Sequence, residues 1–244
     1  MAWGPGINPT DLPNDAFVVV DKSKTPSANE GAVYKGATIA QTKTGGPFFL
    51  YVANFRSGRI EVYDTKFKRV ELDDADNDHG DQAFTDRKSG FAPFNVQEVS
   101  GNLYVTYAKQ NASKHDDFDF PGLGFVDKFS LAGKRLQRSE QGPWLNAPCG
   151  VAIAPANFGF FSNQLLIGNA GSGQIAVYDV DSGHFDGLLR DASGHALQND
   201  RVWALRFGND QGAGPSNWLF FTAGNIAKKL GISVNTLQRS LRAG

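Results

Sequence analysis

The chain has 244 residues, a formal net charge of −1 and a single cysteine, Cys149. This length is sufficient for a large domain with a real hydrophobic core. One cysteine excludes an intramolecular disulfide framework and any paired-cysteine zinc or redox site. The balanced charge removes the simplest electrostatic argument for nucleic-acid binding. The 28 glycines and 19 phenylalanines favour many short strands joined by tight turns.

No apolar stretch approaches the about 20 residues that a membrane-spanning helix needs. Residues 1–6 lack both the basic and the apolar region of a signal peptide. We therefore expect no membrane contact, and a cytoplasmic location for the chain as written.

The predicted strands recur along the chain. Residues 50–64 match residues 165–179 at a constant offset of 115, and both segments read as strand, Asn, Ser-Gly turn and strand closing on Val-Tyr-Asp. A looser copy covers 103–107 and 124–129, and a fourth begins at 218. A short apolar strand precedes each copy, at 36–40, 94–99, 150–154 and 202–207. Three copies are followed by an outer alternating segment, at 69–73, 135–138 and 185–189.

Units of four strands at this period are typical of β-propeller blades. We predict an all-β fold, a β-propeller in residues 1–224 with about 3.5 blades in a partial or minimally closed ring. The expected blades are 35–75, 93–140, 148–192 and a partial one at 201–224. An early strand at 17–21 is expected to join strands 202–207 and 218–223 in a closing blade, because open sheet edges invite aggregation. Open edges also predict oligomer formation.

Several segments carry a resemblance to a known family. They are 15–40, 53–56 (Ala-Asn-Phe-Arg), 91–96 (Phe-Ala-Pro-Phe-Asn-Val), 103–110, 114–117 (Lys-His-Asp-Asp), 150–161 and 203–209. Over residues 15–225 the chain resembles an uncharacterised bacterial family of exported six-bladed propellers found beside the PEP-CTERM sorting system, close to NHL-repeat and gluconolactonase-like propellers. The resemblance implies the fold and no particular reaction.

The chain departs from this family in two ways. Members of the family are longer and carry a signal peptide, and they have Pro-Trp-Gly where this chain has Pro148-Cys149-Gly150. The resemblance thus implies a truncated copy, whose full-length relatives are exported or lie at the cell surface.

Candidate ligand-binding residues lie where propeller loops open near the axis. Asn54 and Asn169 occupy equivalent turn positions, Asn95 and Trp203 begin inner strands, and Tyr107 lies in one of the segments that carry the resemblance. Gluconolactonase-like propellers hold a divalent cation such as calcium with Asn and acidic side chains at this position, so the resemblance implies a metal site of oxygen ligands. The alternative is that Asn54 and Asn169 only shape their turns through side-chain bonds to the backbone.

Two acidic loops contain further candidate metal-binding or catalytic residues. His115, Asp116 and Asp117 lie in a long insertion, where a histidine beside two carboxylates suits metal binding or general-base catalysis; an exposed polar loop has the same composition. Asp74, Asp76 and Asp78 have the alternate spacing at which an EF-hand loop begins, but the glycine and the closing glutamate are absent. Here the alternatives are a surface calcium site and a solvated acidic loop.

Residues 225–244 resemble a helix-turn-helix. Gly231 would lie at the turn, Ser233 would cap the second helix, and Asn235, Gln238 and Arg239 would face the DNA major groove. The segment carries four cations and no acid. The alternative is a helical appendage that covers the open end of the propeller.

These observations predict a scaffold that binds a small molecule or a protein on its axial loop face. The first alternative is a metal-dependent lactonase- or esterase-like hydrolase that uses Asn54, Asn95, Asn169 and the His115 loop. The second alternative is DNA binding, which we expect only through residues 225–244.

Overall fold

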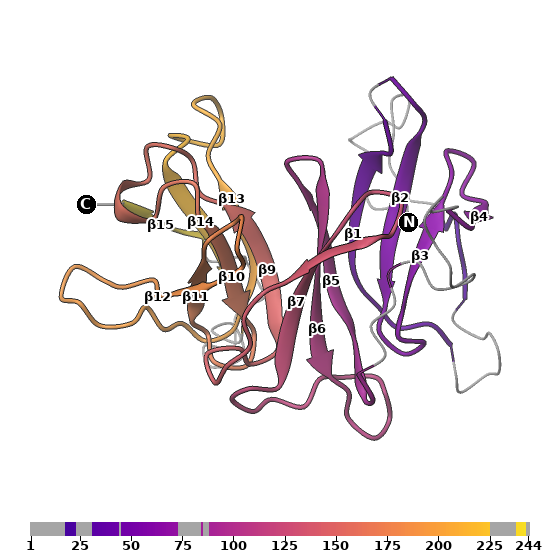
Figure 1. Ribbon diagram of the computed structural model, residues 1–244, viewed down its shortest axis with the longest axis horizontal. Coiled ribbons are helices and arrows are strands. Elements are labelled where there is room, and N and C mark those ends of the chain that lie inside the picture. Colours follow the sequence, from indigo (N-terminus) through magenta and orange to yellow (C-terminus); the bar gives the residue numbers. More distant parts are fainter. Residues whose placement is uncertain are drawn as a thin grey trace.

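The structure is a computed structural model that describes residues 18–22, 31–43, 45–72, 84, 88–224 and the backbone of 238–242. Four antiparallel sheets make up this part of the chain (Figure 1). The only helix among the described residues is a 3-10 turn at Gly159–Phe161. None of the described segments forms a helix long and apolar enough to cross a membrane.

In each sheet the strands follow one another in chain order. The first sheet contains β1 (Tyr34–Gln41), β2 (Phe48–Asn54), β3 (Arg59–Tyr63) and β4 (Arg69–Val70). The second contains β5 (Phe91–Val99), β6 (Asn102–Lys109), β7 (Gly124–Phe129) and β8 (Arg135–Arg138). The third contains β9 (Pro148–Ile153), β10 (Leu165–Asn169), β11 (Ile175–Tyr178) and β12 (Phe185–Leu188). The fourth contains β13 (Val202–Phe207), β14 (Trp218–Ala223) and β15 (Gln238–Arg242).

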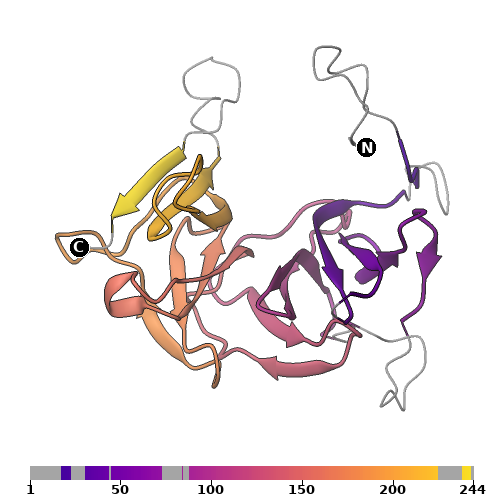
Figure 2. The same cartoon turned by 90° about the horizontal axis from the view of Figure 1, so that it is seen from above.

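The sheets succeed one another around an open arc, with the first sheet at one end and the fourth at the other (Figure 2). The first strands of neighbouring sheets contact each other in turn, β1 with β5, β5 with β9 and β9 with β13. These strands therefore surround the axis of the arc. The prediction of an all-β fold built from four-stranded antiparallel sheets is confirmed.

The third strand of the fourth sheet is not the one that the sequence predicted. This strand is β15, which pairs with β14 from Trp218 opposite Arg242 to Thr222 opposite Gln238. The described residues 18–22 do not form a strand, so an N-terminal strand is not the one that completes this sheet. The free edge of β14 exposes backbone donors and acceptors, and a strand that follows β14 in the chain satisfies them.

The predicted helical tail is likewise not found where the tail is described. Gln238 and Arg239, expected on a recognition helix, belong to the extended strand β15. Asn235 lies outside the described residues. Pairing along a free sheet edge has overridden a helical pattern whose apolar face has no third helix to pack on.

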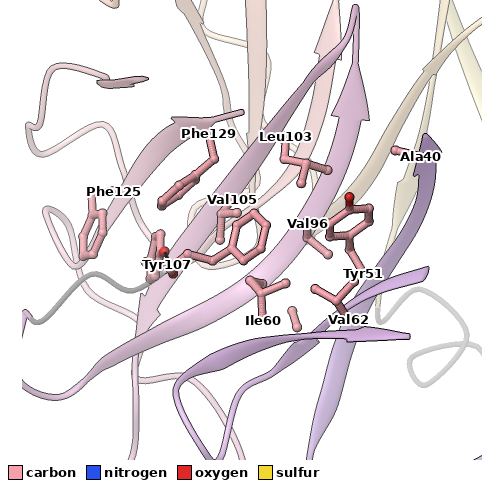
Figure 3. Packing of buried hydrophobic residues seen from close by; sticks show 12 residues of the cluster. Ala40, Tyr51, Ile60, Val62, Val96, Leu103, Val105, Tyr107, Phe125 and Phe129 are labelled. Atoms are coloured by element: carbon pink, nitrogen blue, oxygen red, sulfur yellow. Dashed lines mark hydrogen bonds between the residues drawn. The ribbon is translucent and has the colours of Figure 1, made fainter. Parts of the chain in front are cut away.

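The hydrophobic core lies between successive sheets. Tyr51 and Val62 of the first sheet meet Val96, Leu103 and Val105 of the second, as Figure 3 shows. Similar layers separate the second sheet from the third and the third from the fourth. Burial of each such side chain contributes about 1.5–3 kcal/mol, so the stacked faces hold the arc together.

Candidate functional site

The two equivalent asparagines shape the turns between second and third strands. Asn54 Nδ2 donates to Glu61 Oε1 at 2.9 Å, and Asn54 Oδ1 accepts from the backbone of Val33 and Ser57, each at 3.3 Å. Asn169 Oδ1 accepts from the backbone NH of Asn146 at 2.8 Å. Both asparagines are buried. The Ser57 bond and a bond from Asn169 Nδ2 to the Gln174 carbonyl at 3.2 Å shape the two turns, whereas the remaining bonds hold the asparagines to other segments. A ligand-binding role for either residue stays a prediction.

The long insertion between β6 and β7, residues 110–123, reaches both ends of the arc. Lys35 at the start of β1 donates to Asp116 Oδ1 at 2.9 Å. Arg201, just before β13, donates through Nη2 to Asp119 Oδ2, also at 2.9 Å. Gln110 Nε2 donates to the Phe55 carbonyl at 2.6 Å. The loop thereby links the first and fourth sheets at the end of the axis where the inner strands begin, which we call the axial end.

Two carboxyl groups meet at this end. Burial, reinforced by a hydrogen bond with the Asp117 carboxyl, raises the pKa of Asp119 to about 7, although Arg201 opposes the shift. Asp117 is 8% exposed, and its Oδ2 lies 3.9 Å from Arg201 Nη1. Ionisation of Asp119 would place a negative charge beside Asp117, so the Asp119 carboxyl holds its proton to higher pH than an ordinary aspartate does.

His115 and Asp116 form the exposed side of the same loop. His115 Nδ1 lies 2.9 Å from Asp116 Oδ2, and both side chains face solvent. Hydrogen bonds from Lys35 and then His115 hold the pKa of Asp116 below its usual value. Asp116 is therefore a carboxylate at neutral pH, whereas Asp119, with a pKa of about 7, is only partly ionised there.

Aromatic rings line the axis beneath these charges. Trp203 lies 6.2 Å from Phe94 between ring centroids, and Phe94 lies 5.4 Å from Phe55. The Arg201 guanidinium lies 5.5 Å from the Trp203 ring centroid, and Lys35 lies 5.9 Å from the Phe94 centroid. Stacking of cations on aromatic rings orients both charged side chains.

Asn95 and Cys149 lie among the same inner strands. Asn95 Nδ2 donates to the Cys149 carbonyl at 2.8 Å. Burial, together with the charge of Asp117, raises the pKa of the Cys149 thiol to about 12. Cys149 is accordingly a protonated, unreactive side chain.

The predicted site residues thus lie in different parts of the structure. Asp117 and Trp203 meet Arg201 at the axial end, with Asn95 in the adjoining strand. Tyr107 lies in the core between the first and second sheets, where its hydroxyl donates to the Phe84 carbonyl at 3.0 Å. Asp74, Asp76 and Asp78 lie outside the described residues.

Sequence reasoning missed Asp119 and Arg201. The alternation Asp117-Phe118-Asp119-Phe120, in which both phenylalanines are exposed, was a signal for Asp119. Nothing local marked Arg201, because its partner is 82 positions away in the chain.

The axial end does not fit the cation site expected from the resemblance. The amides of Asn54 and Asn169 already have protein partners, Glu61 Oε1 for Asn54 Nδ2 and the backbone NH of Asn146 for Asn169 Oδ1. At the carboxyl pair, Arg201 supplies the positive charge that a metal ion would bring. Among the described residues no group of three or more His, Cys, Asp or Glu side chains is placed to hold a metal ion.

A search of protein-family models finds no match to this chain. Three curated relatives are uncharacterized proteins of Acanthamoeba polyphaga mimivirus. R640 is 30% identical, and the match covers 78% of this chain and 33% of R640. L690 is 30% identical, with 82% of this chain and 50% of L690 covered. R648 is 28% identical, with 77% of this chain and 44% of R648 covered. The chain spans half or less of the length of these relatives. They are viral, so the resemblance to a bacterial family stays a prediction.

Solved structures are similar to this chain at low sequence identity. The GH93 α-L-arabinofuranosidase of Fusarium graminearum, solved in complex with arabinobiose, has a TM-score of 0.52 and 13% identity, covering 88% of this chain and 59% of that one. Virginiamycin B lyase from Staphylococcus aureus has a TM-score of 0.45 and 13% identity, covering 79% of this chain and 50% of that one. The four antiparallel sheets arranged around one axis identify the chain as an all-β protein of β-propeller type.

Proposed function

We propose that this propeller is a binding scaffold whose axial end takes a small polar molecule. The main support is that charged side chains from three different sheets lie together at the axial end. Lys35 comes from the first sheet, Asp117 and Asp119 from the loop of the second, and Arg201 from the fourth. Groups brought together from distant segments at one end of a propeller axis make a site that orients a ligand.

The chemistry of these groups indicates the class of ligand. Arg201 and Asp119 remain about one-third exposed, so both retain access to solvent. A carboxyl that keeps its proton near neutrality can donate as well as accept, whereas the guanidinium only donates. The exposed rings of Phe118 and Phe120 flank Asp119 in the chain. A neutral molecule with hydroxyl groups and an apolar face suits this combination.

Calorimetric titration with defined probes tests the proposal. Neutral sugars such as arabinobiose and maltose are compared with spermidine and citrate. We expect binding by the sugar class, and an affinity loss of roughly 10- to 100-fold in Asp119→Asn and Arg201→Gln, because each removes a charge-assisted hydrogen bond.

The matched controls are Asp191→Asn and Arg190→Gln in the outer loop of the third sheet. Asp191 accepts backbone hydrogen bonds from Ser193 and His195, and Arg190 donates to the Gly194 carbonyl. Equal losses in the control pair and the axial pair would exclude the axial end as the binding site.

A second candidate function is acid–base hydrolysis at the same carboxyl pair. Its support is the Asp119 pKa of about 7 beside a second carboxyl, a combination suited to general acid catalysis near neutral pH. Nitrophenyl glycosides and esters are suitable probes. This candidate requires turnover whose pH profile bends near 7 and disappears in Asp119→Asn, and it fails if turnover is absent or survives that substitution.

A further inference from the structure

Charged side chains attach the loop 110–123 to both ends of the arc. Among the described residues, two hydrogen bonds join residues 111–121 to the first and fourth sheets. One runs from Lys35 of β1 to Asp116, and the other from Arg201, which precedes β13, to Asp119. Because both acceptors are carboxyl groups, the attachment of the loop depends on how these groups are protonated.

The carboxyls of Asp117 and Asp119 leave two buried oxygens without a donor. Asp117 Oδ2 and Asp119 Oδ1 accept no hydrogen bond in the part of the chain that the structure describes. Arg201 donates to the other oxygen of Asp119, and its Nη1 lies 3.9 Å from Asp117 Oδ2, beyond hydrogen-bond distance. A carboxylate only accepts hydrogen bonds, whereas a carboxyl that keeps its proton also donates. A proton on Asp119 therefore gives the pair a donor that its described neighbours do not supply.

The charges around this pair come from several elements. Burial and then Asp117 raise the pKa of Asp119 to about 7, and Arg201 opposes them. Lys35 of β1 and Asp117 both act on the thiol of Cys149 in β9, which stays protonated because its pKa is about 12. The Asp119 carboxyl is accordingly the member of this set that changes charge near neutral pH.

We propose that the loop 110–123 is a lid over the axial end and that its opening is coupled to release of the Asp119 proton. In the closed loop the proton lies between the two carboxyls, and Arg201 holds the loop to the fourth sheet. In the open loop Asp119 faces water and releases its proton as an ordinary aspartate does. Rising pH therefore favours the open loop, whether or not a ligand is present.

Proton linkage gives the size of the effect. The Asp119 pKa is about 7 in the closed loop and returns toward the ordinary value of 3.8 in the open loop. The equilibrium constant for opening should then rise roughly 50-fold from pH 5 to pH 7. Above about pH 7 both forms are ionised, so the further rise to pH 8 is only about twofold.

Cys149 provides a measure of opening in the unmodified chain. It is the only cysteine in the sequence, it is 7% exposed, and Asp117 of the loop lies close enough to act on its thiol. The full chain, without ligand, is alkylated with N-ethylmaleimide between pH 5 and 8. Each rate is divided by the rate of the same chain unfolded in urea, which removes the pH dependence of the thiol itself. We expect this ratio to rise roughly 50-fold from pH 5 to pH 7 and then to level off.

Two variants test the assignment to the carboxyl pair. Asp119→Asn should make the ratio constant between pH 5 and 8, because an amide of the same shape does not ionise. Asp117→Asn should weaken the pH dependence without abolishing it, because it removes the second carboxyl and leaves Asp119 partly buried.

Two further variants are controls in the same loop. Asp116→Asn removes the exposed ion pair with Lys35, so it should raise the ratio by up to about fivefold at every pH and leave the pH dependence as it is. His115→Gln is needed because histidine also changes charge between pH 5 and 8, and His115 lies 2.9 Å from Asp116. This variant should retain the pH dependence of the unmodified chain.

Four results overturn the proposal. They are a ratio that does not change between pH 5 and 7, a change that persists in Asp119→Asn, a change that is lost in His115→Gln, and a dependence of the ratio on urea as steep as that of global unfolding, which would mean that the whole fold opens. None of these measurements uses a sugar, so a failure to bind sugars leaves them unaffected and is distinguishable from a failure of the lid.

Discussion

Arg201, which immediately precedes the innermost strand of the last sheet, donates to Asp119 in the loop of the second sheet at 2.9 Å. Lys35 of the first sheet bonds to Asp116 of the same loop at 2.9 Å. One loop thereby ties together sheets that have no common edge. The carboxyl pair, the guanidinium and the half-buried Trp203 owe their positions to this connection.

The Asp119 carboxyl makes stability fall as pH rises. Its pKa is about 7 in the folded chain, above the ordinary value of 3.8. Between about pH 4 and 7 the folded state therefore holds a proton that the unfolded state has released, and the stabilising contribution is lost as pH rises through 7. Thermal melts of Asp119→Asn should show a smaller decrease over this interval than the unmodified chain. Asp191→Asn should leave the decrease unchanged.

Glu61 has the opposite dependence on pH. Burial alone raises the pKa of Glu61, but hydrogen bonds from Tyr63, Asn54 and Tyr34 outweigh burial and hold the pKa below its usual value. The contribution to stability is present above the pKa of the unfolded chain and is lost as pH falls through the folded pKa. Glu61→Gln should reduce the acid-induced fall in melting temperature. An unchanged acid limb in this variant would contradict the assignment.

The buried ion pair of Asp127 and Arg138 should be costly to break. Asp127 is fully buried, and Arg138 donates to its two oxygens at 2.7 and 2.8 Å. Arg138→Ala removes both of these charge-assisted hydrogen bonds from a buried carboxylate, so we expect a loss of about 3–5 kcal/mol in urea unfolding. Arg69→Ala removes an exposed pair with Glu71 and should cost less than about 1 kcal/mol. Similar losses in the two variants would contradict this view of the pair.

Two glycines at the same repeat position provide a matched pair of substitutions. Gly58 and Gly173 both have a φ of +69°, but a Cβ on Gly58 meets nothing within 4 Å, whereas one on Gly173 would lie 1.5 Å from the Asn199 carbonyl oxygen. Gly58→Ala should cost about 1–2 kcal/mol, the strain of a left-handed backbone. Gly173→Ala carries the same strain and also displaces the backbone at Asn199. Chemical denaturation should rank Gly173→Ala as clearly more destabilising; equal values would mean that the contact with Asn199 is dispensable.

The strands of the repeats were predictable because their signals are local. Alternating apolar residues define the two faces of a strand, and turn glycines with positive φ, such as Gly58 and Gly173, mark where it ends. The 115-residue offset connects equivalent positions, and the structure places both copies in the second and third strands of a sheet. The sequence also named Asp117, a carboxylate in a long loop, and Trp203, an aromatic residue at the start of an inner strand; the structure places both beside Arg201, and their role in binding stays a prediction.

The sequence by itself determined the strands of the first three sheets, the first two strands of the fourth and their order along the chain, since each depends on residues close together in the chain. Only the tertiary structure decided that Asp119 meets Arg201, that Asn54 turns inward to Glu61, and that Gln238–Arg242 extends a sheet. A charged side chain pairs with an opposite charge that the folded chain places next to it. A free strand edge forms hydrogen bonds with any backbone segment that lies close enough to pair with it. These outcomes depend on distances across the folded chain, and local residue patterns do not encode such distances.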